Sequence, residues 1–274
     1  MKKSLLYKAL LNVFFIFLVL VVLLPMVWLI INSFKTNNEL FLNSLKLPKV
    51  WQFSNYVQAW ERGLFTYFGN SLAVSSVSLL LILAFSSLLS YGITRFDTKG
   101  GKFIFLIVLG GMALSEQVAL VPLYKILKAM HIYNTYWAVI LPYVSFRIPF
   151  TVFLMRAYFL GIPKELEEAA FVDGYNTLQI FTKIIVPISK PVLASCAIVN
   201  LNFVWNEFLF ANVFLESKSI MTIPIGLMTF KGDLRADYTV MLAGIAIASL
   251  PMIVLFLAMQ KQFVRGLTAG AVKG

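Results

Sequence analysis

Polar side chains that could contact a solute lie inside otherwise apolar segments of this chain. Glu116, Gln117 and Arg147 interrupt two such segments, and a third segment holds a denser polar group. That group consists of Asn200, Asn202, Trp205, Asn206 and Glu207. A charged side chain costs roughly 2.5–3.5 kcal/mol at the centre of a membrane-spanning helix, so these groups need a partner or a water-filled path. They could line a path for a polar solute, or they could hydrogen-bond neighbouring helices together.

Helical spacing predicts where these groups lie relative to one another. On a continuous helix Asn200 and Glu207 share one face, while Asn202 and Asn206 share another. Glu116 and Arg147, each expected midway along its own segment, could form an ion pair.

The residue sets that catalysis or metal binding would need are missing from the sequence. One cysteine, Cys196, excludes an internal disulfide, and the single histidine, His131, cannot build a histidine-based metal site. The segment Gly100-Gly101-Lys102 lacks the spacing and the following Ser/Thr of a phosphate-binding loop. We therefore expect no enzyme, no metal site and no bound cofactor, so that any ATP would be bound by another chain.

The composition indicates a membrane protein. Hydrophobic residues make up 60% of the chain and charged residues 13%, whereas soluble domains have about 45–50% and about 25%. Such an apolar excess cannot be buried in a single core, so we expect lipid contact. The net charge of +11 does not indicate a nucleic-acid partner, because the charges are sparse and lie between long apolar runs.

Six apolar segments are long enough to cross the hydrocarbon core as helices. We predict these spans at 10–32, 69–93, 103–127, 136–158, 188–213 and 239–261. We interpret the first as an anchor, because its apolar run is too long for a signal peptide and lacks a cleavage site. The predicted fold class is therefore all-α, a polytopic membrane protein with six transmembrane helices.

The distribution of charge predicts the orientation. Six spans place both termini on one side, and that side would hold 13 of the 23 Lys and Arg residues. Because basic segments favour the cytoplasm, we predict cytoplasmic N- and C-termini. Residues 33–68 would form a long outer loop, either an amphipathic hairpin at the membrane interface or a functional segment.

Residues 159–187 are too polar to span the membrane and too patterned to be a linker. Gly174 can take the left-handed conformation that ends a helix. Asn176 or Thr177 would then cap a second short helix, which Pro187 would end. We predict a helix–turn–helix on the cytoplasmic face.

This segment resembles the EAA loop of ABC importer permeases. The residues that carry the resemblance are Glu168, Ala169, Ala170, Gly174, Ile184 and Pro187, with Val186 where the family pattern has Leu. Asn32–Asn37, Asn55-Tyr56, Ala59-Trp60 and Trp205-Asn206 also resemble the second permease subunit of maltose-type carbohydrate importers, so that the resemblance covers nearly the whole chain.

The resemblance implies a type I ABC importer permease fold in a bacterial cell membrane. It divides the chain into an anchor helix with its outer loop at 1–68, a transmembrane domain at 69–261 and a cytoplasmic tail at 262–274. It implies a second permease, two ATPase subunits that hold ATP and Mg²⁺, and an extracytoplasmic substrate-binding protein as partners.

The resemblance also implies roles for residues of the EAA loop. Glu168 and Asp173 would make polar contacts with an ATPase subunit, Ala169 and Ala170 would form a close-packing face, and Gly174 would form the turn. The alternative is an amphipathic loop that packs only on its own helix bundle.

The expected solute is a di- or oligosaccharide. Amide and carboxylate groups beside an aromatic ring suit a sugar, although the partner permease could hold it instead. A permease for glycerol phosphate or another non-sugar solute is an alternative, but Arg147 is the only basic residue expected within a span, which favours a neutral sugar. Another alternative is an autonomous transporter coupled to protons through Glu116 or Glu207.

Overall fold

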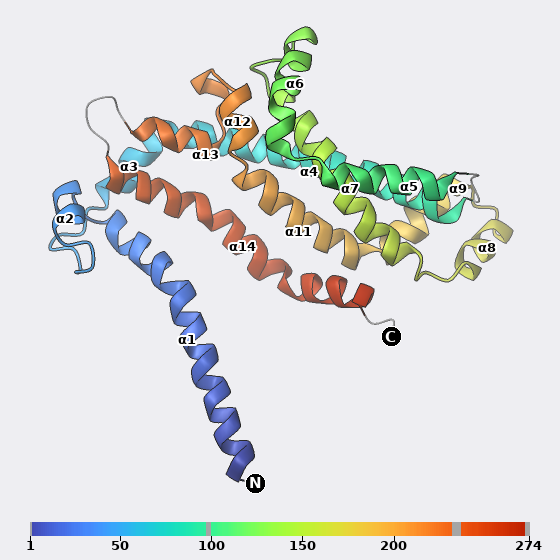
Figure 1. Cartoon of the computed structure of the whole chain (residues 1–274), viewed down its shortest axis with the longest axis horizontal. Helices are drawn as coiled ribbons and strands as arrows, with labels where there is room; N and C mark the ends of the chain where they lie inside the picture. Colours follow the sequence, from blue (N-terminus) through green and yellow to red (C-terminus); the bar gives the residue numbers. More distant parts are fainter. Residues whose placement is uncertain (1, 97–99, 232–236, 272–274) are drawn as a thin grey trace. The chain divides into compact units, whose positions relative to one another are not determined.

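The computed structural model describes residues 2–96, 100–231 and 237–271, and every regular element among them is a helix (Figure 1). The longer helices are α1 (Lys2–Ser33), α4 (Phe65–Arg95), α5 (Gly101–Gly110), α6 (Glu116–Ala129), α7 (Trp137–Phe159), α11 (Lys190–Asn206) and α14 (Tyr238–Ala271). The shorter ones are α2 (Asn37–Leu42), α3 (Ser54–Ala59), α8 (Glu165–Val172), α9 (Thr177–Ile180), α10 (Val186–Ile188), α12 (Leu209–Phe214) and α13 (Ile223–Gly226). The π turns are Trp60–Leu64 and Phe181–Ile185, and the 3₁₀ turns are Gly111–Ala113, Lys218–Ile220 and Leu227–Phe230.

Four helical segments among the described residues are long and apolar enough to cross a membrane by themselves. They are Leu10–Ser33, Ser54–Arg95, Trp137–Phe159 and Tyr238–Gln260, which correspond to the first, second, fourth and sixth predicted spans. The third and fifth predicted spans each correspond to a bent pair of helices, so the number of crossings is six if each pair counts as one.

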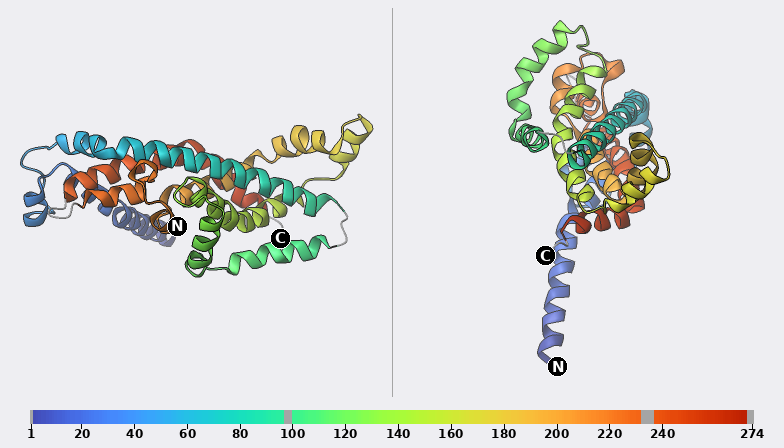
Figure 2. Two further views of the ribbon diagram at one scale, coloured as in Figure 1. Left: turned by 90° about the horizontal axis from the view of Figure 1, so that it is seen from above. Right: turned by 90° about the vertical axis from the view of Figure 1, so that its right-hand side faces the viewer.

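The third predicted span is not a continuous helix. The helical segment Gly101–Ala113 meets α6 at an angle of 100°, a bend that Figure 2 shows clearly. Leu114 and Ser115 have extended backbone between the two parts. Hydropathy does not detect such a break, because it averages over residues without regard to backbone direction. Glu116 therefore begins α6 and does not lie midway along a span.

The fifth predicted span also ends early. α11 stops at Asn206, Glu207 has extended backbone with a ψ of 128°, and a new helix, α12, begins at Leu209. The prediction that Asn200 and Glu207 share a helix face was wrong, because Glu207 lies beyond the end of the helix. At its other end α11 follows the helical run Thr177–Ile188 through a bend of 76°.

The chain forms two compact units. The first consists of residues 1–65 and 226–250, and the second of residues 66–225 and 251–274. The domain boundaries predicted after residues 68 and 261 remain predictions. The end of the predicted tail, 272–274, lies outside the described residues.

In the second unit α7 is the central helix, because it packs against α5, α11 and α12. One apolar core lies around Tyr143 of α7 and Phe210 of α12, and another lies around Phe159 of α7 and Ile180 of α9. α4 contributes a row of buried serines, which lets other helices approach its backbone closely. These two cores thus support the two regions in which the candidate site residues lie.

In the first unit a buried lysine joins the end of α1 to the following loop. Lys35 is 1% exposed, and its Nζ donates to Asn32 Oδ1 at 2.9 Å and to the carbonyls of Asn43 and Ser44 at 2.9 and 3.1 Å. Burial lowers the pKa of the Lys35 amine, an effect that nearby Glu39 opposes. The three N–H donors of the ammonium group therefore all have acceptors inside the unit.

Residues 33–68, predicted as an outer loop, contain ordered helical structure. Asn55 donates through Nδ2 to the carbonyls of Ser33 and Lys35, at 2.8 Å each. The ring of Phe34 packs against three aromatic rings, those of Trp51, Phe53 and Tyr56. Two segments that lie apart in the sequence, Asn32–Asn37 and Asn55-Tyr56, therefore contact each other. These contacts hold the loop to the end of α1.

Candidate functional site

The segment 159–187 contains the predicted helix–turn–helix. It lies at one end of the second unit, where α8 and α9 are drawn in Figure 1. Gly174 has a φ of +85°, its N–H donates to the Phe171 carbonyl, and the N–H of Tyr175 donates to the Ala170 carbonyl, both at 3.0 Å. These two bonds are the Schellman arrangement that ends α8. Glycine occupies this left-handed conformation without the clash that a side chain would cause.

The second helix of this segment has its own cap. Asn176 Oδ1 accepts from the Gln179 N–H and Gln179 Oε1 accepts from the Asn176 N–H, both at 2.9 Å, which forms a capping box. Asn176, one of the two predicted candidates, is thus the cap. The expectation that Pro187 ends this helix was wrong, because the helical run continues to Ile188. The π turn Phe181–Ile185 changes the hydrogen-bond register just before the proline, which has no N–H to donate.

Exposure separates the residues of the EAA loop. Glu168, Ala169 and Asp173 are exposed on the outer surface of α8 and its cap, whereas Ala170 is buried in the apolar core around Ile180. The two alanines therefore do not form one exposed face, and Ala169 alone remains available for close approach by another protein.

Farther along the same loop, Ile184 packs partly on this core, while Pro187 is exposed. Both residues lie in the helical run that leads into α11.

A buried charge cluster beneath α8, which we call the Arg95 cluster, escaped sequence reasoning. It consists of Tyr91, Arg95 and Glu167. Glu167 is 7% exposed; its Oε1 lies 2.5 Å from Arg95 Nε, and its Oε2 accepts from the Tyr91 hydroxyl at 2.9 Å. Helical spacing places Glu167 on the same inner face as Ala170. That spacing was the available signal, and it could not identify a partner on α4.

Among the spans, Asn200 is a structural residue. It is fully buried in α11, its Nδ2 donates to Thr151 Oγ1 at 2.9 Å and to the Cys196 carbonyl at 2.8 Å, and its Oδ1 accepts from Arg147 Nε at 3.0 Å. The guanidinium of Arg147 also lies over the Phe203 ring, 4.5 Å from its centroid. Asn200 therefore joins α7 to α11, the helix-bonding alternative that the sequence left open.

Glu116 and Arg147 do not form the ion pair that we considered. The ion pairs among the described residues are Arg62–Asp237 and Arg95–Glu167. Glu116 is half-buried at the start of α6, and Gln117 is exposed and accepts from the Ser115 hydroxyl at 2.6 Å.

Glu207 is also held in place by this chain. Its carboxylate accepts from the Tyr143 hydroxyl at 2.5 Å and from the N–H groups of Phe210 and Ala211 at 2.8 and 3.2 Å. These N–H groups belong to the first turn of α12, so the carboxylate stabilises the start of that helix. Nearby Trp205 is buried and makes an edge contact with the Phe68 ring.

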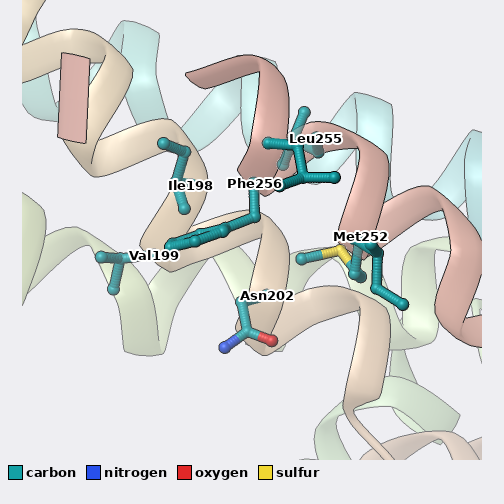
Figure 3. Close-up of a pocket in the computed structure, with 8 residues that line it drawn as sticks. Ile198, Val199, Asn202, Met252, Leu255 and Phe256 are labelled. Atoms are coloured by element: carbon teal, nitrogen blue, oxygen red, sulfur yellow. The ribbon is translucent and has the colours of Figure 1, made fainter. Parts of the chain in front are cut away.

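Asn202 and Asn206 are the exposed members of the polar group on α11. They share one face as predicted, and Asn206 Nδ2 donates to Asn202 Oδ1 at 2.9 Å. Asn202 also lines an open cavity of about 430 Å³ between α11 and the later part of α14. Figure 3 shows its amide beside the apolar side chains of Met252 and Phe256. An exposed amide beside an aromatic ring is the kind of surface expected for a sugar.

Comparison with known proteins identifies the family. The chain matches the family described as "Binding-protein-dependent transport system inner membrane component" over residues 2–269. It is 45% identical to the probable ABC transporter permease protein YurM of Bacillus subtilis over 95% of this chain and 87% of that protein. It is 38% identical to the arabinooligosaccharides transport system permease protein AraQ of Halalkalibacterium halodurans over 100% of this chain and 99% of that protein. It is 33% identical to the trehalose/maltose transport system permease protein MalG of Thermococcus litoralis over 100% of both chains.

A solved structure shows the same fold. The chain superimposes with a TM-score of 0.83 on a chain from the crystal structure of a bacterial ABC transporter involved in the import of the acidic polysaccharide alginate, with 21% sequence identity. The match covers 96% of this chain and 98% of that chain. The predicted fold class, that of an ABC importer permease, is confirmed.

Proposed function

The chain belongs to the family of binding-protein-dependent transport system inner membrane components, and on that premise we propose that it forms the path for an oligosaccharide together with a second permease. It is a non-catalytic, multi-pass permease of the inner membrane. The proposal for the solute is supported by relatives named for arabinooligosaccharides, for melibiose, raffinose and stachyose, and for trehalose and maltose.

The observation that carries the proposed mechanism is the exposed outer surface of α8. The exposed residues of α8, which has eight residues and ends in a glycine turn, include Leu166, Glu168, Ala169 and Phe171. In our proposal this surface docks into one of two ATPase subunits on the cytoplasmic side, which hold ATP and Mg²⁺. Closure of the ATPases would move α8 and thereby rock the spans between inward-open and outward-open states.

The surroundings of Arg147 favour a neutral sugar over an anionic solute. Its Nε donates to Asn200 and its guanidinium lies over the ring of Phe203, so part of the guanidinium is already bound within the chain. Asn202 and Asn206 offer exposed amides instead. We propose that these two amides face the sugar, with Phe256 providing apolar contact with its ring.

The engagement of Glu207 with three donors does not suit a proton carrier, which must exchange its proton with water. An autonomous transporter coupled to protons through Glu207 is therefore the weaker proposal. The glycerol phosphate alternative is weakened by the engaged Arg147.

Uptake by reconstituted vesicles tests the proposal. The chain would be reconstituted with its partner permease, its ATPases and its binding protein, and supplied with labelled raffinose, maltose or arabinooligosaccharide. We expect uptake of one of these sugars to need both ATP and the binding protein, and labelled glycerol 3-phosphate to stay outside. Uptake that follows an imposed proton gradient without ATP would contradict the proposal.

A further inference from the structure

The Arg95 cluster links α8 to a helix of the membrane domain through buried side chains. α8 has eight residues, of which only Glu167 and Ala170 are buried. Packing alone gives such a short helix few contacts that could hold its orientation. The ion pair between Glu167 and Arg95 and the hydrogen bond from the Tyr91 hydroxyl supply directional contacts where apolar packing is sparse.

The partners of Glu167 lie on one helix. Arg95 is the last residue of α4 and Tyr91 lies one turn before it, so both approach the carboxylate from the same side. Arg95 also donates through Nη2 to the Ile162 carbonyl at 2.9 Å. The end of α4 is thereby bonded both to α8 and to the segment 160–164, which joins α7 to α8.

The environment makes these contacts difficult to break. The side chains of Arg95 and Glu167 are 7% and 10% exposed. Separating two charges inside a protein leaves each without its partner in a medium where water cannot replace it, so the pair resists separation more than an exposed pair does. The ion pair therefore ties the end of α4 to α8.

We propose that Tyr91, Arg95 and Glu167 are positioning residues that transmit the movement of α8 to α4. This inference rests on the proposed function, because it takes α8 to be the surface that an ATPase moves. In this account Glu168 and Ala169 receive the movement on the outer side of α8, and Glu167 passes it inward. Loss of the cluster separates ATP hydrolysis from transport while the ATPases stay bound.

The test uses the complete transporter in vesicles and measures sugar transported per ATP hydrolysed. Glu167→Gln and Tyr91→Phe remove the charge and the hydroxyl, and Glu165→Gln, which changes an exposed carboxylate on the same helix, is the matched control. Couplings between sites in proteins commonly correspond to about 5- to 150-fold, so we expect Glu167→Gln to lower this ratio about fivefold or more. Tyr91→Phe should lower it less, and Glu165→Gln should leave it unchanged.

A double variant separates transmission from simple stability. Arg95→Met with Glu167→Met leaves no unpaired buried charge, so the complex should regain its thermal stability relative to either single variant. The ratio of sugar to ATP should nevertheless stay low. Stimulation of ATP hydrolysis by the binding protein should be reduced as well, because in our proposal its signal reaches the ATPases through the same contact between α4 and α8.

The inference would be overturned if the double variant transported as much sugar per ATP as the unmodified protein. It would also be overturned if the loss of transport in a single variant were fully explained by a loss of bound ATPase. Absence of ATP-dependent sugar uptake by the unmodified transporter is a different result, because it contradicts the proposed function itself.

Discussion

Glu167 and Glu207 are two buried carboxylates of equal exposure, 7% each. They differ in the groups that they bind. Glu207 accepts hydrogen bonds from two backbone N–H groups and from the Tyr143 hydroxyl. It therefore stabilises the break between α11 and α12 in the fifth predicted span. Glu167 is bonded to side chains of α4, so it joins one helix to another. The backbone N–H groups bonded to Glu207 fix local geometry. Glu167 contacts side chains of another helix, and in our proposal these contacts make α8 and α4 move together.

The largest effect on stability should come from the fixed carboxylate. Glu207→Ala removes the acceptor of three donors, and each unsatisfied buried group costs about 1–3 kcal/mol, so we expect the free energy of unfolding to fall by about 3 kcal/mol or more. Thermal unfolding of the purified complex measures this. Glu216→Ala is the control, because this exposed carboxylate accepts from the Tyr133 hydroxyl; equal losses from both variants would contradict the comparison.

The next largest effect concerns the turn at the end of α8, the helix that we propose docks into an ATPase. Gly174→Val places a β-branched residue at a φ of +85°, which costs about 1–2 kcal/mol and disrupts the turn that ends α8. We expect ATP-dependent uptake to be lost while the protein still inserts into the membrane.

Two controls accompany this variant. Gly174→Asn should retain much of the uptake, because asparagine tolerates the left-handed conformation. Gly92→Ala should be neutral, since a Cβ at this position in α4 has nothing within 4 Å. Normal uptake by Gly174→Val would show that α8 does not need this turn.

Two asparagines on α11, the buried Asn200 and the exposed Asn202, should respond differently to substitution. Asn200→Ala removes the acceptor of Arg147 Nε and the donor to Thr151 Oγ1, so we expect a loss of about 1–3 kcal/mol in stability. Asn202→Ala should leave thermal unfolding unchanged and raise the KM for sugar about five- to tenfold, which corresponds to one lost hydrogen bond. The opposite result, in which Asn200→Ala raises the KM and leaves stability unchanged, would show that the sugar path follows the face of α11 that carries Asn200.

The smallest effect should come from the cap of α9. Asn176→Ala removes one half of the capping box and should lower stability by about 1 kcal/mol. Hydrogen exchange of the Gln179 amide is the direct measurement, because its N–H loses the Asn176 acceptor. Gln179→Ala removes the other half and should leave that amide protected. Unchanged exchange in Asn176→Ala would mean that packing of Ile180 holds this turn by itself.

The sequence predicted the helix–turn–helix within residues 159–187 well, because the signals that define it are local. A helix end needs a left-handed residue and a helix start needs a side-chain acceptor, and Gly174 and Asn176 supply these within a few residues of the groups they contact. The family pattern adds exposed residues such as Glu168, whose contact with an ATPase stays a prediction.

The remaining features depend on contacts between distant residues. Apolar composition predicted that residues 103–127 cross the membrane, but the 100° bend depends on how the two parts pack. The polar group on α11 was recognised, yet whether an asparagine is buried against α7 or exposed depends on the neighbouring helices. Glu167 looked like one of several acids at a helix start, since its partner Arg95 lies far away in the sequence.

The environment of Lys35 makes this residue a chemical probe of the first unit. An amine acylates only when its nitrogen is accessible to the reagent, and Lys35 is 1% exposed with Nζ donating to three oxygens. In a lysine-labelling experiment followed by mass spectrometry, it should remain unmodified while exposed Lys46 and Lys49 react quickly. The rate at which Lys35 becomes labelled then measures how often the junction between α1 and its following loop opens.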